Sequence, residues 1–182
     1  LGAGGIGALV GGYMIRGGAE VSFLVRREET KRSISENGLE LVEQNGSVTV
    51  EPAAVFTSVP NNYEADLVMV AVKGPATDAA LAHIQDLDYE TIVSLQNGLD
   101  KYDVLKHYTE PEKILGMFSL SFGTVIEDGR INVSKISTTY IGELDGRKTE
   151  RTSRLQEICE ASGMTAVVSE NILSCEWSKK AH

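Results

Sequence analysis

The sequence feature that most constrains the fold is the glycine-rich stretch at the start of the chain, residues 1–7. Gly2, Gly4 and Gly7 have the G-x-G-x-x-G spacing of a turn that binds dinucleotides. In such a turn the first glycine allows a tight bend out of a strand, the second lets the backbone approach a pyrophosphate, and the third lets a helix pack closely on the sheet. The amide groups at the start of that helix then face the phosphates. We expect the turn to consist of Gly2, Ala3, Gly4, Gly5, Ile6 and Gly7.

The residues around this turn support the same interpretation. An apolar helix is predicted over residues 8–15, two glycines end it, and a strand is predicted over 21–25. Turn, helix and strand make up most of a βαβ unit of about 30 residues. The strand that should precede the turn is reduced to Leu1, and the first residue is not Met, so we expect the chain to be a piece of a longer protein. The alternative is a structural glycine-rich helix start that binds no ligand.

The rest of the pattern predicts an α/β fold. Residues 66–73 are nearly all apolar, as in a central parallel strand that is covered on both faces. We expect a Rossmann-like, doubly wound, mostly parallel sheet with an antiparallel extension. We assign residues 1–168 to a nucleotide-binding domain and 169–182 to the start of a helix that leads into a second domain. The predicted strands cover 21–25, 39–43, 47–50, 66–73, 91–95, 114–122, 130–133, 138–142 and 165–168, and the predicted helices cover 8–15, a short segment ending near 37, 77–87, 99–108, 149–161 and a segment from 170 onward.

Composition excludes several classes of function. The chain has 182 residues, of which 42% are hydrophobic and 24% charged, as in an ordinary globular protein. The net charge of −9 argues against nucleic acids and anionic membranes as partners, and no apolar run reaches the ~18–20 residues of a membrane span. Cys159 and Cys175 lack C-x-x-C spacing, so we expect reduced thiols and, by default, a cytoplasmic location. The three histidines show no metal-site or catalytic-triad spacing, so no metal is expected.

Arg26 and Arg27 follow the second strand, where a dinucleotide site contacts the adenosine ribose. An acidic residue at this strand end accepts a hydrogen bond from the 2′-hydroxyl of NAD, whereas an arginine pairs with the 2′-phosphate of NADP. Because no acidic residue precedes the arginines, we prefer NADP. Glu28 and Glu29 keep NAD open, and an Arg/Glu opening of a helix is also a common solvated surface.

Polar residues also follow two other predicted strands. Lys73 ends the central strand, and Asn97 comes directly after the next one. Ligands of open α/β sheets bind outside the carboxyl ends of the strands, so both residues can face a cofactor or substrate. A solvated strand-end lysine and a simple Asn-Gly turn are the structural alternatives. Lys179 and Lys180 point about 100° apart on a helix, so at most one of them lines a given pocket.

Together, these pieces resemble the N-terminal domain of the ketopantoate reductase (2-dehydropantoate 2-reductase) family. Each piece is short, but their order and spacing are far more specific than the glycine pattern alone. The matching pieces are the glycine turn over 2–7, Leu24-Val25-Arg26, Val70-Ala71-Val72-Lys73, Leu95-Gln96-Asn97-Gly98, Gly129 ahead of Ile141-Gly142-Glu143, and Trp177-Ser178-Lys179.

The resemblance implies NADPH-dependent reduction of the 2-keto acid ketopantoate to pantoate, on the route to pantothenate and coenzyme A. It implies that the glycine turn binds the pyrophosphate and that Arg26 binds the 2′-phosphate. Lys73 and Asn97 would then face both cofactor and substrate, and Lys179 would bind the substrate and act as the catalytic general acid on the keto oxygen. The resemblance also implies a helical second domain, absent from this chain, which supplies further substrate-binding groups. It leaves a homodimer open.

Two other functions stay open at this point. One is a related NAD(P)-dependent dehydrogenase of another 2-keto or hydroxy acid, such as an opine type, which the sequence beyond His182 would distinguish. The other is a nucleotide-sensing domain that binds NAD(H) without chemistry, which predicts that no activity depends on Lys179. We expect residues 1–182 alone to bind the cofactor but to catalyse little turnover of ketopantoate.

Overall fold

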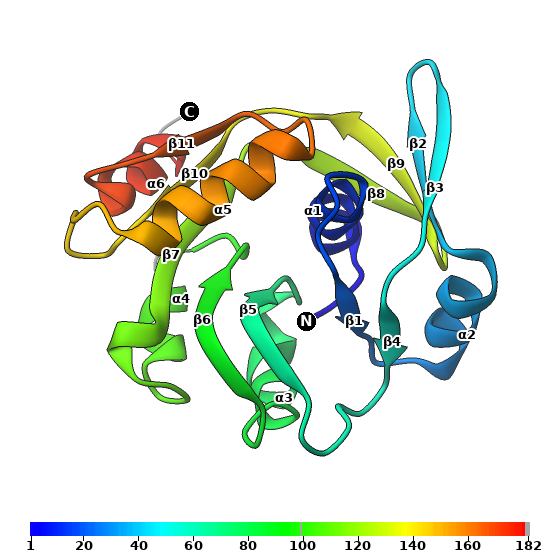
Figure 1. The fold of residues 1–182 in the computed structure, drawn as a ribbon, viewed down its shortest axis with the longest axis horizontal. Helices are drawn as coiled ribbons and strands as arrows, with labels where there is room; N and C mark the ends of the chain where they lie inside the picture. Colours follow the sequence, from blue (N-terminus) through cyan, green and yellow to red (C-terminus); the bar gives the residue numbers. More distant parts are fainter. Residues whose placement is uncertain (99, 181–182) are drawn as a thin grey trace.

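The computed structural model of the chain describes residues 1–98 and 100–180, without the side chains of residues 179 and 180. Its described strands form a two-stranded, a five-stranded and a four-stranded sheet arranged around helix α1 (Figure 1). The α-helices are α1 (Gly5–Arg16), α2 (Glu28–Asn37), α3 (Thr77–Ala82), α4 (Lys101–Leu105), α5 (Glu150–Ala161) and α6 (Ile172–Lys180), and the short 3-10 helices are η1 (Gly74–Ala76) and η2 (Pro111–Lys113). The strands are β1 (Ser22–Leu24), β2 (Leu39–Glu43), β3 (Gly46–Val50), β4 (Ala54–Phe56), β5 (Glu64–Val70), β6 (Asp88–Ser94), β7 (Ile114–Ser119), β8 (Phe122–Glu127), β9 (Arg130–Lys135), β10 (Thr139–Gly142) and β11 (Ala166–Val168).

The five-stranded sheet has the order β11-β10-β7-β6-β5. Strands β5, β6 and β7 run parallel, β10 is antiparallel to β7, and β11 is parallel to β10. One apolar core joins this sheet to α1 and α5, and a second core joins it to α3 and α4. Because both faces are covered, the prediction of a Rossmann-like, doubly wound α/β fold is confirmed.

Strands β1 and β4 form a separate parallel pair, and the first two residues of the chain join this pair to β5. The amino nitrogen of Leu1 donates to the Met69 carbonyl (2.5 Å), and the Ala71 amide donates to the Leu1 carbonyl (2.9 Å). On the other side, the Gly2 amide donates to the Leu24 carbonyl at the end of β1 (2.8 Å). The glycine turn therefore begins where β1 and β5 both end.

The antiparallel extension forms a sheet of its own, with the order β3-β2-β9-β8, and it packs over α1 (Figure 1). The predicted strands 39–43 and 47–50 form a hairpin, because β2 pairs antiparallel with β3 across Asn45. Strand β9 runs antiparallel to β8 and parallel to β2. Contact with the helix is close: a Cβ atom added at Gly12 of α1 would lie 3.0 Å from a methyl carbon of Leu41 in β2.

Several predicted boundaries are wrong. The strand predicted over 114–122 is two strands, since β7 ends at Ser119 and β8 begins at Phe122. The Ser121 amide donates to Ser119 Oγ (3.1 Å), and this local turn separates them. The helices predicted over 77–87 and 99–108 are shorter, as α3 and α4, and the three-residue strand β4 has no clear signal in the sequence.

Candidate functional site

The glycine turn shows why each glycine of the G-x-G-x-x-G pattern is needed. Gly2 has φ +90°, a conformation that L side chains rarely adopt. A Cβ atom at Gly7 would lie 2.2 Å from the Gly2 carbonyl oxygen and 2.8 Å from Ala71 Cβ, so only glycine lets α1 approach the end of β5. A Cβ atom at Gly4 would have no described neighbour within 4 Å. The backbone at Gly4 therefore faces open space, as the approach of a pyrophosphate requires.

The start of α1 provides the electrostatic part of the same site. The helix begins at Gly5, with Gly4 as its N-cap residue, and its first turn contains no acidic residue. The first amides of a helix have no intrahelical acceptor and form the positive end of the helix dipole. A phosphate fits this position, both by the donors it would meet and by the absence of a blocking Cβ atom.

A glycine far away in the chain also shapes this turn. A Cβ atom at Gly5 would lie 2.1 Å from the carbonyl oxygen of Gly123 in β8, and one at Gly123 would lie 2.9 Å from the Gly5 carbonyl oxygen. The sheet that covers α1 therefore touches the turn backbone to backbone. Sequence analysis did not find Gly123, because only the three-dimensional contact distinguishes it from any other glycine.

The structure separates the two arginines after β1. Arg26 is exposed and makes no ion pair with any described residue. Arg27 instead pairs with Asp128 in the turn between β8 and β9, where Thr30 also donates to Asp128 Oδ1 (2.9 Å). Glu28, which kept NAD open in the sequence, accepts a hydrogen bond from Thr57 and lies 3.5 Å from Lys31. Arg26 is therefore the arginine available to an added phosphate.

Lys73 and Asn97 lie at the same edge of the sheet, and both are exposed. The strand predicted over 66–73 ends at Val70, so Lys73 lies in the loop after β5, as Asn97 lies in the loop after β6. Gln96 joins these two loops. Its Nε2 donates to the Val72 carbonyl (2.8 Å) and to Thr77 Oγ1 (2.6 Å). Since the positions next to Lys73 and Asn97 are hydrogen-bonded to each other, the structure holds the two loops together beside the glycine turn. The sequence marked Gln96 as part of a matching piece but not as this link.

A buried polar cluster follows directly after the Asn97 turn. Lys101 and Glu176 form an ion pair with Nζ–Oε1 at 2.5 Å, and both side chains are almost fully buried. The Tyr102 hydroxyl donates to the same oxygen (2.9 Å). Burial raises the pKa of Tyr102 well above its ordinary value, and the charge of Glu176 adds to the shift, so the hydroxyl keeps its proton. Sequence analysis missed this cluster.

Lys179, the predicted general acid, lies on α6, three residues after Glu176. Its side chain, like that of Lys180, lies outside the described part of the chain. The helix itself is anchored at its start by Ile172, which is 1% exposed and would meet Cβ atoms added at Gly116 and Gly142. The structure thus places the helix that carries Lys179.

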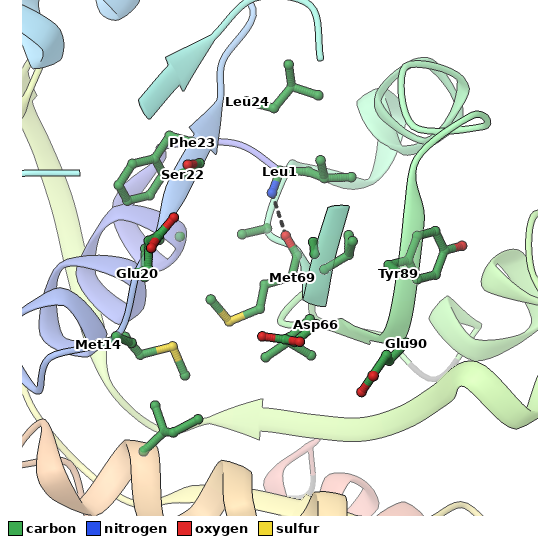
Figure 2. A pocket seen from close by; sticks show the side chains of 18 of the residues that line it. Leu1, Met14, Glu20, Ser22, Phe23, Leu24, Asp66, Met69, Tyr89 and Glu90 are labelled. Carbon is green, nitrogen blue, oxygen red and sulfur yellow. Dashed lines mark hydrogen bonds between the residues drawn. The ribbon is translucent and has the colours of Figure 1, made fainter. Parts of the chain in front are cut away.

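A cavity of about 1000 Å³ extends from the underside of the glycine turn, where Gly2 and Gly7 line it, to the amino ends of the strands (Figure 2). The part between β1 and β5 that lies away from the turn is lined by carboxylates at the amino ends of the strands, Glu20, Asp66 and Glu90. Open α/β sheets bind ligands at the opposite, carboxyl ends, and these carboxylates would repel the phosphates of a dinucleotide.

Other site classes receive no support from the described residues. They contain no cluster of His, Cys, Asp and Glu that could hold a metal ion. None of their helices is long and apolar enough to cross a membrane. Both cysteines are free thiols, and burial raises the pKa of Cys159 to about 12, with a smaller contribution from Glu160, so this thiol is unreactive.

Comparison with known proteins identifies the family. A family model described as ketopantoate reductase PanE/ApbA matches residues 1–146. The chain belongs to the ketopantoate reductase family. The resemblance predicted from the short matching pieces is therefore confirmed.

Relatives within and near the ketopantoate reductase family agree with this assignment. The 2-dehydropantoate 2-reductase of Archaeoglobus fulgidus is 28% identical to this chain, and the alignment covers 98% of this chain and 58% of that protein. The crystal structure of 2-dehydropantoate 2-reductase from Geobacter metallireducens superposes with a TM-score of 0.89 at 27% identity, covering 98% of this chain and 60% of that one. The chain therefore spans about three fifths of the length of these ketopantoate reductase relatives.

A further solved structure shares the fold. D-mandelate dehydrogenase, in a ternary structure with NADH and anilino(oxo)acetate, has a TM-score of 0.86 at 22% identity and covers 98% of this chain and 58% of that one. At this identity the likeness concerns the fold alone.

Proposed function

We propose that the protein that contains this chain reduces 2-dehydropantoate to pantoate with NADPH, a step toward pantothenate and coenzyme A. One observation carries the proposal: in a chain of the ketopantoate reductase family, a glycine turn built for a pyrophosphate lies at the same sheet edge as the exposed residues Arg26, Lys73 and Asn97. We place the reaction in the cytoplasm, with a small 2-keto acid as the partner and without nucleic acid or membrane partners.

The cofactor half of the proposal assigns residues 2–7 to the pyrophosphate and Arg26 to the 2′-phosphate. The open space at Gly4 supports the first assignment. The second is supported by the contrast between Arg26, which is available, and Arg27, which is committed to Asp128. A guanidinium matches a phosphate group in bidentate geometry, and this favours NADP over NAD. When bound, the reduced nicotinamide supplies the hydride.

The substrate half assigns an electrostatic and proton-donating role to Lys179. As hydride reaches C2 of the 2-keto acid, the C=O π electrons move to oxygen, and a positioned ammonium group stabilises that charge and gives the oxygen its proton. Lys73 and Asn97, in the loops that follow β5 and β6, would bind the cofactor amide and the substrate carboxylate. Further substrate groups would come from a helical second domain, with residues 1–168 forming the nucleotide-binding domain and 169–182 the start of the connecting helix. A homodimer is compatible with this arrangement.

The experiment that tests the proposal follows NADPH oxidation by the whole protein in the presence of 2-dehydropantoate. Lys179→Ala should reduce kcat by at least roughly 100-fold, the lower range of general acid catalysis, while the Kd for NADPH stays within about twofold, a change of about 0.4 kcal/mol. Lys180→Ala is the matched control and should retain activity. A wild-type protein that binds NADPH but leaves 2-dehydropantoate unreduced would contradict the substrate assignment.

A second candidate is reduction of a different 2-keto acid. D-mandelate dehydrogenase, whose structure contains NADH, shares the fold, and this observation favours the second candidate. A panel of branched and aromatic 2-keto acids with NADPH and NADH distinguishes the two, because the correct pair should give the highest kcat/KM. A protein that binds nucleotide but reduces none of them, with no effect of Lys179→Ala, would instead be a nucleotide-sensing domain.

A further inference from the structure

Lys101 and Glu176 form a buried ion pair that the proposed chemistry does not use. Their side chains are 3% and 7% exposed. They come from α4 and α6, 75 residues apart in the chain. Taking two charges out of water costs several kcal/mol for each ion, so a pair in this position needs a physical explanation.

The ammonium group of Lys101 contacts three separate elements. Besides Glu176, Nζ donates to the Ser94 carbonyl at the end of β6 (2.9 Å) and to the Met117 carbonyl of β7 (3.0 Å). The Gln96 carbonyl, next to Asn97, lies at 3.4 Å. Because hydrogen bonds are directional, one nitrogen atom defines the positions of β6, β7 and α6 relative to one another.

Only one oxygen of the Glu176 carboxylate is hydrogen-bonded to described residues. Oε1 accepts hydrogen bonds from Lys101 and from the Tyr102 hydroxyl. Oε2 is buried and has no hydrogen-bond partner among the described residues. An ion pair with an unsatisfied oxygen is a poor source of stability, and apolar replacements of buried pairs are often neutral or stabilising. An apolar pair cannot reproduce the directional hydrogen bonds that Lys101 and Glu176 make.

Glu176 anchors α6 together with Ile172. Ile172 packs against Gly116 of β7 and Gly142 of β10 at the start of the helix. Glu176 follows one turn later, and Lys179 comes three residues after it. With an apolar anchor and a polar anchor one turn apart, the helix has both its depth and its rotation about its axis defined.

We propose that Lys101 and Glu176 are positioning residues, which hold α6 and its Lys179 in place relative to the Asn97 turn. The proposal rests on the proposed function, in which Lys179 and Asn97 act on the same substrate. Lys101 touches both parts, because it contacts the Gln96 carbonyl next to Asn97 and the carboxylate three residues before Lys179.

The test replaces the pair in the whole protein by apolar residues of similar size, Lys101→Met with Glu176→Leu. The double variant should melt close to the wild type, since apolar replacement removes the desolvation cost. Its kcat with 2-dehydropantoate should fall roughly 10- to 100-fold, because misplacement by about 1 Å is enough for such a loss, while the Kd for NADPH stays within about twofold. Ile34→Ala is the control: Ile34 is a buried residue of α2, on the other side of the molecule from α6 (Figure 1), so this change should lower stability and leave kcat unchanged.

A second readout does not need turnover. Trp177, next to Glu176, is the single tryptophan of residues 1–182, and its emission overlaps the absorption of reduced nicotinamide. In a background where Trp177 is the only tryptophan, energy transfer to bound NADPH should change in the double variant and stay constant in Ile34→Ala. If the wild type does not reduce 2-dehydropantoate, the proposed function fails, and the transfer efficiency still decides whether the pair positions α6.

The proposal is overturned if the folded double variant keeps the wild-type kcat, or, for a protein inactive on 2-dehydropantoate, the wild-type transfer efficiency. If the double variant does not fold, Tyr102→Phe takes its place. This change removes one hydrogen bond to Glu176 with little change in volume. It should lower kcat by at least threefold, about 0.7 kcal/mol and within the range of a single hydrogen bond, and an unchanged kcat would overturn the proposal equally.

Discussion

The two halves of the candidate site are built in opposite ways. At the glycine turn, residues 2–7, the structure depends on side chains that are missing: Cβ atoms at Gly5 and Gly7 would collide with backbone oxygens, and one at Gly4 would enter open space. At the end of β6, the structure depends on buried polar side chains, with Gln96 linking β5 to β6 and Lys101 linking β6 to α6.

This difference separates binding from chemistry. A turn made of backbone amides presents fixed donors to any phosphate, so it binds a cofactor without adjusting to a substrate. A network of side-chain hydrogen bonds sets the relative positions of groups from distant segments, and reactions are sensitive to such positions. We therefore expect changes in the glycine turn to affect folding and cofactor affinity, and changes in the polar half to affect kcat.

The largest expected effect comes from adding one methyl group to the glycine turn. Gly7→Ala places a Cβ atom 2.2 Å from the Gly2 carbonyl oxygen, in rigid backbone, and should cost at least about 3 kcal/mol of unfolding free energy, the upper range of overpacking. Gly4→Ala is the matched variant, since nothing described lies within 4 Å and its φ of −78° suits alanine. It should melt like the wild type but bind NADPH roughly tenfold more weakly, about 1.4 kcal/mol.

Thermal denaturation and NADPH titration of both glycine variants check this prediction. Wild-type NADPH affinity in Gly4→Ala would contradict this account of the turn, because the pyrophosphate would then not approach the backbone at Gly4. A Gly7→Ala protein as stable as the wild type would show that the turn can shift, which contradicts a rigid backbone site.

The next largest effect concerns Arg26, which follows β1. Arg26→Ala should weaken NADPH binding by roughly 10- to 100-fold, the value of one or two charge-assisted hydrogen bonds, and leave NADH binding nearly unchanged. Arg27→Ala removes only the contact with Asp128 and should change neither affinity by more than about threefold, since exposed ion pairs contribute little. Fluorescence titration with both nucleotides checks the pair. Equal losses for NADPH and NADH in Arg26→Ala would mean that this arginine does not read the 2′-phosphate.

The smallest effect is a pH dependence of stability at Glu143, which pairs with Arg151 beside the start of β7 and lies outside both halves of the site. Burial alone would raise the pKa of Glu143, but hydrogen bonds from Arg151 and Thr149 outweigh it and hold the pKa below the ordinary 4.5. A lowered folded-state pKa contributes stability that is present above the unfolded pKa and is lost as pH falls below about 4.5. Glu143→Gln should cost about 1 to 1.5 kcal/mol at neutral pH and flatten the stability profile between pH 5 and 3. Chemical denaturation across that range measures both, and an unchanged acid limb would assign the dependence to other groups.

What the sequence predicts and what it misses correspond to the same two halves of the site. The glycine turn, the doubly wound sheet and the Asn45 hairpin were predictable, because each depends on local spacing or periodicity. The contacts of Lys101 with Glu176 and of Gln96 with Thr77 were not, because they join residues 75 and 19 positions apart. A lysine or glutamine reads as solvated in a sequence, and only the fold shows that Lys101 is buried.

The measurement that tests this account most directly is a crystal structure of the whole protein with NADPH. We predict the pyrophosphate within hydrogen-bonding distance of the backbone amides of residues 4–6, the 2′-phosphate against Arg26, and no cofactor in the cavity between β1 and β5. A dinucleotide with its phosphates away from the glycine turn, or inside that acidic cavity, would contradict the central claim that the turn is the cofactor site.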